Sequence, residues 1–409
     1  MKKALFILVT AVSLLTACHN NESASQETFE QVVLMYMPWS GSNIYPYFLR
    51  NIAGMRQTII DMQGGGKKKV MVIIGDRENR AHLIHLRYVK KMNDCVNDTI
   101  ETYNYLNGQS FYSAEGMASM FNKAKASLRA KKYALIVGCH GMGWIPIDAR
   151  NDYAKPMFAP GSGKSLYHNN NEGTPIDREI LTRYIGDGYH EDYMAEITTL
   201  ATAIRNSFGH TDYILFDDCY MMNIEVAYDL KDVTDYLIGS TCEVMIEGMP
   251  YDKMGRCLLL DDYEAVVYEF YTWYSSYYNP YGTLAVTKTS EINQLADIMR
   301  QINAAHEWVP DSIRTVQRLD GFDPIVFFDM KSYVKRLCAD DESLFQQFEQ
   351  QLNRTVPYAR CTPRFYSVLL RRTYSITEFS GITISDPSFS YATRRKEETA
   401  WWKATHEGE

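Results

Sequence analysis

Two residues that could form a nucleophile and its base each follow a strongly apolar run. His140 comes after YALIV, residues 133–137, and is followed directly by Gly141. Cys219 comes after YILF, residues 213–216. A thiol becomes a strong nucleophile when a neighbouring imidazole accepts or shares its proton. The pair therefore has the residue types that cysteine nucleophile chemistry requires.

The apolar runs before these residues predict buried strands of a single sheet. Similar β-rich runs begin at Val32, Val70 and Tyr236, and they alternate with segments of helical spacing such as 113–132 and 194–208. This alternation predicts an α/β fold, a mostly parallel sheet with helices on both faces. Reactive groups in such sheets gather at the carboxyl ends of the strands, where we expect the histidine and the cysteine.

The segments that follow the two reactive residues are also informative. Residues 221–232 have helical spacing, with Met222, Val226 and Leu230 on one stripe, so we expect Cys219 at a strand-to-helix turn. A helix N-terminus there would favour the thiolate. Three later β-rich runs, which begin at Gly282, Pro324 and Gly381, predict that the sheet continues or that a C-terminal α/β extension packs on it.

Spacing alone would also fit a core histidine and a core cysteine, but the sequences of two motifs are more specific. HGMGW at His140 and DDCYMMNIEVAYDLKDVTDYLIGS, residues 217–240, resemble the clostripain family of cysteine peptidases, within the caspase-like group. The likeness extends from VVLMYMPWSGSN at Val32 to MPY at Met249, and more loosely to a C-terminal GITISDP and WW. It covers most of the chain after residue 30.

The resemblance implies a caspase-like fold and a role for each matching residue. His140 would be the general base and Cys219 the nucleophile that forms a thioester acyl-enzyme. The amides of Gly141 and Cys219 would form the oxyanion hole. Asp217 would lie at the floor of a pocket that selects arginine or lysine, unless it is only a helix N-cap. A second acid is expected within 243–247.

Three residues depart from the family pattern and keep other functions open. Asp218 stands where the family usually has a small residue, and a carboxylate pointing toward the nucleophile would raise the pKa of the thiol, so its removal is expected to be neutral or activating. Cys139 and Met142 are unusual neighbours of the histidine. The alternatives are a catalytically degenerate peptide-binding lipoprotein and a surface ligand-binding lipoprotein that uses some of the 30 tyrosines and 6 tryptophans.

The N-terminus predicts export and lipid anchoring. Residues 1–17 have two lysines followed by a short apolar run, as in a secretion signal, and Cys18 after Leu-Thr-Ala matches the bacterial lipoprotein pattern. Residues 18–30 lack the apolar side chains needed for a core and indicate a flexible tether. We therefore expect a peptidase domain over 31–409, held by its lipid at the bacterial cell envelope, on the outer membrane and facing the periplasm or the surface.

The composition limits the kinds of molecule that this protein is expected to bind. The formal net charge of −8 argues against nucleic acid as a partner. We expect a monomer that acts on protein or peptide substrates with basic residues. The cysteines are scattered without CxxC pairs, so no zinc site is indicated and no cofactor is expected to be required. Calcium is an alternative that the sequence leaves open, because NDY at Asn151 and LDDYE at Leu260 carry oxygen ligands, although EF-hand spacing is absent.

A polar stretch between the two reactive residues predicts regulation by cleavage. Residues 149–175 are rich in glycine, proline and asparagine, which indicates an exposed loop open to proteolysis. Arg150, Lys155 and Lys164 lie within it and match the specificity expected from Asp217. The resemblance implies a zymogen, and we expect autocleavage after one of these residues, although an insertion without a role would look similar.

Overall fold

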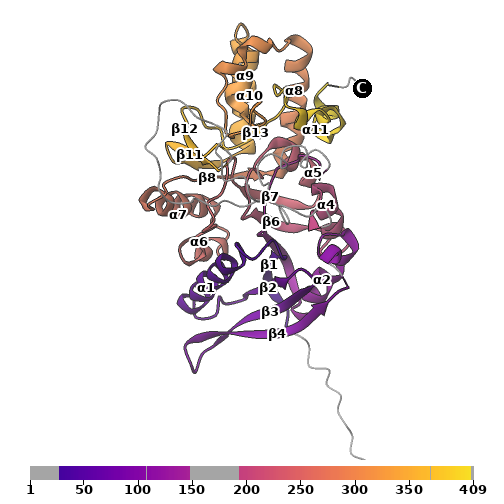
Figure 1. Cartoon of the computed structure of the whole chain (residues 1–409), viewed down its shortest axis with the longest axis vertical. Coiled ribbons are helices and arrows are strands. Elements are labelled where there is room, and N and C mark those ends of the chain that lie inside the picture. Colours follow the sequence, from indigo (N-terminus) through magenta and orange to yellow (C-terminus); the bar gives the residue numbers. More distant parts are fainter. Residues whose placement is uncertain (1–26, 107, 148–192, 369, 407–409) are drawn as a thin grey trace, which may run out of the picture.

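The computed structural model describes residues 27–106, 108–147, 193–368 and 370–406 (Figure 1). Within them lies a nine-stranded sheet with the order β10-β8-β7-β6-β5-β1-β2-β3-β4. Its strands are β1 (Phe29–Met37), β2 (Lys68–Arg77), β3 (Arg80–Val89), β4 (Asp94–Asn104), β5 (Ala130–Val137), β6 (Thr211–Phe216), β7 (Thr234–Gly239), β8 (Thr283–Lys288) and β10 (Tyr358–Cys361). The strands predicted at Val32, Val70, Tyr133, Tyr213, Tyr236 and Gly282 are all present.

The middle of this sheet is parallel. β2, β1, β5, β6 and β7 pair in parallel, whereas β3 and β4 at one edge and β8 and β10 at the other pair antiparallel. The predicted α/β fold with a mostly parallel central sheet is confirmed. β3 and β4 were not predicted, and their charged and half-exposed residues suit an edge of the sheet better than its middle.

Helices cover both faces of the sheet because the apolar side chains of each central strand point both ways. In β1, Val33 and Met35 belong to one buried cluster, while Val32 and Leu34 belong to the other. One face carries α1 (Tyr45–Asp61), α6 (Tyr251–Leu258) and α7 (Tyr263–Ser276), and the opposite face carries α2 (Ala114–Ser127), α4 (Ile197–Arg205) and α5 (Ile224–Leu230) (Figure 1). The expectation of helices on both faces is confirmed.

The C-terminal part of the chain forms an α/β extension at one end of the sheet (Figure 1). It contains α8 (Ile292–Ala305), α9 (Met330–Leu337), α10 (Glu342–Thr355), α11 (Ala400–His406) and two short antiparallel pairs, β9 (Phe328–Asp329) with β13 (Thr383–Ile384) and β11 (Arg364–Ser367) with β12 (Arg372–Ser375). The run at Pro324 was expected to be a longer strand, but only its end pairs. Asp320 accepts the N–H groups of Val326 and Phe327 instead.

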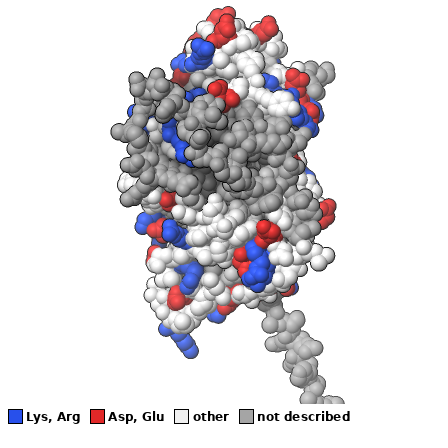
Figure 2. Space-filling model, viewed as in Figure 1, with Lys and Arg blue, Asp and Glu red and all other residues white. Residues whose placement is uncertain are grey.

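The described surface is mixed in charge, with Lys and Arg next to Asp and Glu on the face that Figure 2 shows. Among the described helices, none combines the length and the apolar character that crossing a membrane requires.

Candidate active site

The two reactive residues leave the sheet at the same edge, from neighbouring parallel strands. Val137 at the end of β5 lies opposite Phe216 at the end of β6, and the N–H of Asp217 donates to the carbonyl of Val137 at 2.8 Å. His140 and Cys219 each follow three residues after their strand ends. The pairing of the strands therefore sets the two loops side by side, as expected for a parallel sheet.

Gly141 brings the backbone of the histidine loop against Cys219. A Cβ atom at position 141 would lie 2.2 Å from the carbonyl oxygen of Cys219 and 2.9 Å from its nitrogen. Real side chains do not tolerate such contacts, so only glycine fits this close approach. The approach agrees with the expected function of this glycine, which needs its backbone at the nucleophile.

His140 is buried, and its hydrogen bond defines which ring nitrogen is basic. Nε2 lies 3.1 Å from the carbonyl oxygen of Ser40, in the loop after β1. A carbonyl can only accept, so Nε2 carries the proton and Nδ1 is the nitrogen that can act as a base. Ser40 lies in WSGSN, part of the stretch that carried the family resemblance, but its role was not predicted.

Cys219 is fully buried, and a backbone amide is directed at its sulfur. The N–H of Val244 donates to Sγ at 3.2 Å. This dipole favours a negative charge on sulfur. The expected helix N-terminus at the thiol is wrong, because α5 begins five residues later at Ile224 with Asn223 as its N-cap. A turn takes the place of that helix end.

The turn after Cys219 is held in an uncommon backbone conformation. Tyr220 has a φ of +58°, in the left-handed region that side chains rarely adopt. Its N–H donates to Cys242 at 3.0 Å, its hydroxyl donates to Glu243 at 2.7 Å, and its ring stacks on Phe327. Burial, with Glu243 as the next cause, raises the pKa of Tyr220 well above its ordinary value. These contacts fix the turn that presents the cysteine.

Asp217 is fully buried and tied to the segment that begins α6. The N–H of Met249 donates to Oδ1 at 3.0 Å, and the hydroxyl of Tyr251 donates to Oδ2 at 3.1 Å. The alternative that Asp217 caps the helix after the nucleophile is wrong, because Asn223 caps it. The partners come from MPY, a motif that the resemblance included without assigning it a role.

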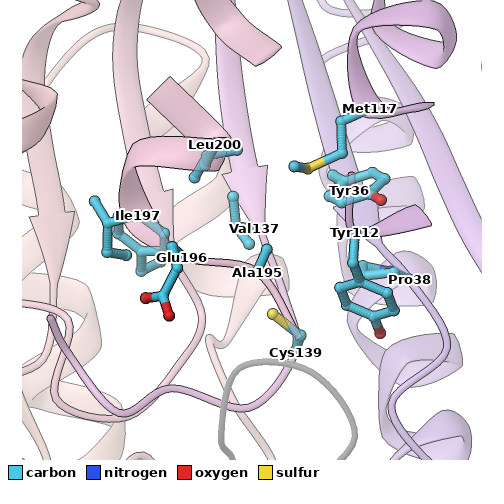
Figure 3. Close-up of a pocket in the computed structure, with 11 residues that line it drawn as sticks. Tyr36, Pro38, Tyr112, Met117, Val137, Cys139, Ala195, Glu196, Ile197 and Leu200 are labelled. Atoms are coloured by element: carbon cyan, nitrogen blue, oxygen red, sulfur yellow. The ribbon is translucent and has the colours of Figure 1, made fainter. Parts of the chain in front are cut away.

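Asp218 contacts the loop that carries the histidine. Its Oδ1 accepts the N–H of Cys139 at 2.5 Å, and the thiol of Cys139 lies 3.8 Å from Oδ2. The carboxylate is therefore directed at the histidine loop. Cys139 also lines a small apolar cavity of about 30 Å³ between β1, β5, α2 and α4 (Figure 3).

The two candidates for the second acid have different surroundings. Glu243 is buried and accepts the hydroxyl of Tyr220 and, at 2.9 Å, the N–H of Val368. Glu247 is half-buried and accepts the hydroxyl of Tyr277 at 2.7 Å. Glu243 thus supports the turn after Cys219, while Glu247 lies two residues before the amide that binds Asp217.

The described residues contain no group of His, Cys, Asp and Glu side chains arranged to hold a metal ion. In the loop at Leu260, Asp261 pairs with Lys68 at 2.6 Å and Asp262 caps α7, so both acids have structural partners. The predicted lipidation residue Cys18, the loop 149–175 and the calcium candidate at Asn151 lie outside the described residues. So do Arg150, Lys155 and Lys164.

Comparison with known proteins shows that this protein is a cysteine peptidase with an α/β fold. The family model described as the clostripain family matches residues 171–360. The chain is 41% identical to iotapain, a secreted cysteine protease from Bacteroides thetaiotaomicron, covering 93% of this chain and 100% of that one, with a TM-score of 0.81. The chain therefore belongs to the clostripain family, as its motifs predicted.

Other solved structures are also similar. A clostripain from Bacteroides thetaiotaomicron, in complex with the peptide inhibitor BTN-VLTK-AOMK, is 52% identical over 55% of this chain and 100% of that one, with a TM-score of 0.53. An inactive zymogen protease from Parabacteroides distasonis is 22% identical, with a TM-score of 0.72 over 93% of this chain and 99% of that one, and supports the fold alone. The curated proteins gave no match.

Proposed function

We propose that this peptidase cleaves peptide bonds after arginine or lysine, with Cys219 as the nucleophile and His140 as its base. The observation that carries the proposal is the position of both residues after the carboxyl ends of the paired strands β5 and β6, where the backbone of Gly141 lies against Cys219. The thiolate attacks the carbonyl carbon of the substrate and forms a tetrahedral oxyanion. The imidazolium of His140 then gives its proton to the leaving amine, and a thioester remains.

The second half of the reaction releases the acyl group. A water molecule loses a proton to His140 and attacks the thioester, and the sulfur leaves and regains its proton. The amides of Gly141 and Cys219 are the proposed donors to the oxyanion in both steps. The bond from Nε2 of His140 to Ser40 supports this scheme, because it leaves Nδ1 to exchange the proton.

The proposed specificity depends on two acids, one buried and one half-buried. Asp217 has a fixed carboxylate close to the nucleophile in sequence, and a basic substrate side chain would compensate its charge. Glu247 is the better candidate for the second acid, because Glu243 already supports Tyr220. The peptide named in the inhibitor of the 52% identical clostripain ends in lysine, which supports a preference for basic residues.

A peptide-library cleavage profile tests this function on the protein lacking residues 1–18. We expect cleavage after Arg or Lys, with no cleavage by Cys219→Ala prepared in parallel. Cleavage after other residues would overturn the specificity. Binding of basic peptides without any cleavage would favour the degenerate peptidase, in which Asp218, Cys139 and Met142 have weakened the chemistry.

We also propose that the enzyme is a lipid-anchored envelope protein and a monomer. The signal pattern over 1–17 and the cysteine at position 18 support the anchor, and iotapain is described as secreted. Incorporation of labelled fatty acid into the wild type, and its loss in Cys18→Ser, would test the anchor. A labelled Cys18→Ser protein would exclude this site.

Activation by self-cleavage is the last part of the proposal. The thiol of Cys219 and the carboxylate of Asp217 are fully buried in the intact chain, which supports a requirement for activation. We place the cut after Arg150, Lys155 or Lys164. On a gel, wild type should give two fragments and Cys219→Ala should stay intact, and replacing all three basic residues should block the cut. A fully active wild type that stays intact would rule out this activation.

A further inference from the structure

The carboxylate of Asp218 joins the two loops that carry the reactive side chains. It is fully buried, and its Oδ1 accepts the N–H of Cys139 at 2.5 Å. Asp218 directly precedes Cys219, and Cys139 directly precedes His140. One hydrogen bond therefore connects positions that are each one residue away from a reacting group. Hydrogen bonds in a buried setting are stronger than those exposed to water.

The bond stands where the regular ladder between β5 and β6 would continue. The last backbone bond of the ladder runs from the N–H of Asp217 to the carbonyl of Val137. In a regular parallel ladder, the N–H of Cys139 would donate next to the carbonyl of Asp217. A side-chain oxygen of Asp218 takes this N–H instead. The two backbones can then depart from strand geometry and remain connected.

The loop around His140 is held on its other sides as well. The N–H of Gly138 donates to the carbonyl of Tyr36 at 2.9 Å, and Nε2 of the imidazole reaches Ser40. On the nucleophile side, a Cβ atom at Gly141 would lie 2.9 Å from the Cβ atom of Asp218. Cys139 and Gly141, the residues before and after His140, therefore both contact the loop that carries Cys219. The contact of Cys139 depends on the carboxylate of Asp218.

We propose that Asp218 is a positioning residue, whose bond to the Cys139 amide sets the imidazole of His140 relative to the thiol of Cys219. This role rests on the proposed function, in which these two side chains react together. It replaces the sequence expectation that removing the carboxylate is neutral or activating. Small displacements of reacting groups lower turnover steeply, so a single hydrogen bond at this place has a large kinetic effect.

Three substitutions separate the hydrogen bond from charge and from the thiol contact. Asp218→Asn keeps an oxygen for the Cys139 amide but removes the charge. Asp218→Leu has the same branched side-chain skeleton, is bulkier, and has no acceptor. Cys139→Ala removes only the sulfur contact. Asp329→Ala is the matched control, because Asp329 is an equally buried acid that accepts backbone N–H groups at the start of α9, in the extension.

The measurements are kcat, KM and the pH profile of kcat/KM on a lysyl amide, together with the melting temperature. The processing state of every variant is checked on a gel first. We expect kcat to stay within about threefold of wild type in Asp218→Asn and Cys139→Ala, and to fall by about 10- to 100-fold in Asp218→Leu with KM nearly unchanged. Asp329→Ala should lower the melting temperature and leave kcat unchanged.

Several results would overturn the positioning role. If Asp218→Asn loses as much kcat as Asp218→Leu, or if both shift the pH profile equally, the charge acts and not the bond. Asp218→Ala is a second, smaller substitution that also removes the acceptor. If Asp218→Leu and Asp218→Ala both fail to fold while Asp329→Ala folds, the carboxylate is only structural. An inactive Cys219→Ala beside a fully active Asp218→Leu would overturn the positioning role alone, whereas an active Cys219→Ala would also overturn the proposed function.

Discussion

Two pairs of buried carboxylates in this molecule are held in different ways. Asp217 and Asp218, directly before Cys219, accept backbone N–H groups and a tyrosine hydroxyl at 2.5 to 3.1 Å. Glu225 in α5 and Asp386 in the extension form the other pair. Oε1 of Glu225 accepts the N–H of Ser385 at 2.8 Å, while Oε2 is buried without a hydrogen-bond partner among the described residues.

The pKa values of Glu225 and Asp386, the second pair, are raised. Burial, reinforced by Asp386, raises the pKa of Glu225 to about 8. Burial raises the pKa of Asp386 to about 7, against the opposing effect of Lys396. The pair therefore retains protons near neutral pH and couples α5 to the extension. Asp217 and Asp218 hold backbone geometry through directed hydrogen bonds, whereas Glu225 and Asp386 hold protons, so substitutions of the two pairs should have different effects.

The largest effect is expected from substitution of the two proposed reacting groups, Cys219 and His140. Cys219→Ala and His140→Ala should each lower kcat/KM on arginyl or lysyl amides by about 10⁴-fold or more and leave the fold intact. Labelling of Cys219 by an arginine-type chloromethyl ketone should be lost in the first variant. Cys139→Ala is the matched control and should remain active. An inactive Cys139→Ala beside an active Cys219→Ala would show that the other thiol is the nucleophile.

Asp217→Asn should reduce the preference for basic residues without unfolding the protein. Asparagine can still accept from Met249 and Tyr251, but it leaves the substrate charge uncompensated. We expect a loss of about 2 to 4 kcal/mol in transition-state binding of lysyl and arginyl substrates. The ratio of kcat/KM for a lysyl and a neutral substrate measures it. Unchanged kinetics on basic substrates would remove Asp217 from the pocket.

Glu225→Gln should change stability and its dependence on pH. The unfolded chain releases this proton near the ordinary pKa of a glutamate, whereas the folded protein keeps it up to about pH 8. Stability contributed by this group therefore falls as pH rises from about 4.5 to 8. Glutamine keeps the bond to Ser385 and removes that loss, so the variant should be more stable than wild type at pH 8 by roughly 2 to 5 kcal/mol.

Urea denaturation of the two proteins at pH 5 and pH 8 measures this difference. The stabilisation should be small at pH 5 and large at pH 8. Asp386→Asn should show the same sign, because the pKa of its carboxyl is also raised. Equal stabilisation at both pH values would contradict proton retention by Glu225.

The smallest effect is expected where the extension meets the histidine loop. Nε1 of Trp144 donates to the hydroxyl of Ser385 at 2.9 Å, and Ser385 also donates to Glu225. Trp144→Phe should cost about 1 kcal/mol, part of which should already be lost in Ser385→Ala. A double-mutant cycle on the free energy of unfolding measures the coupling. Strictly additive effects would show that this bond does not connect the two parts.

Much of the fold could be predicted from the sequence, because its central strands are continuous apolar runs that require burial on both faces. The runs at Tyr133 and Tyr213 became neighbouring parallel strands, and the stripe of Val226 and Leu230 became the buried face of α5. The strands that were missed, β3 and β4, are half-exposed edge strands whose apolar pattern is weak. Edge strands depend on pairing with a neighbour, which a linear pattern does not reveal.

The sequence by itself determined the family, the strand ends that carry His140 and Cys219, and the glycine between them, because these depend on residue type and local pattern. Tertiary structure alone decided which groups hold them. Ser40, Val244 and Tyr251 lie far along the chain from their partners His140, Cys219 and Asp217. The contacts of Ser40 and Val244 use backbone atoms, which carry no signal of residue type. Asp218 is the clearest case. Its type suggested repulsion of the thiolate, but the divergence of two strands placed its oxygen on the amide before His140.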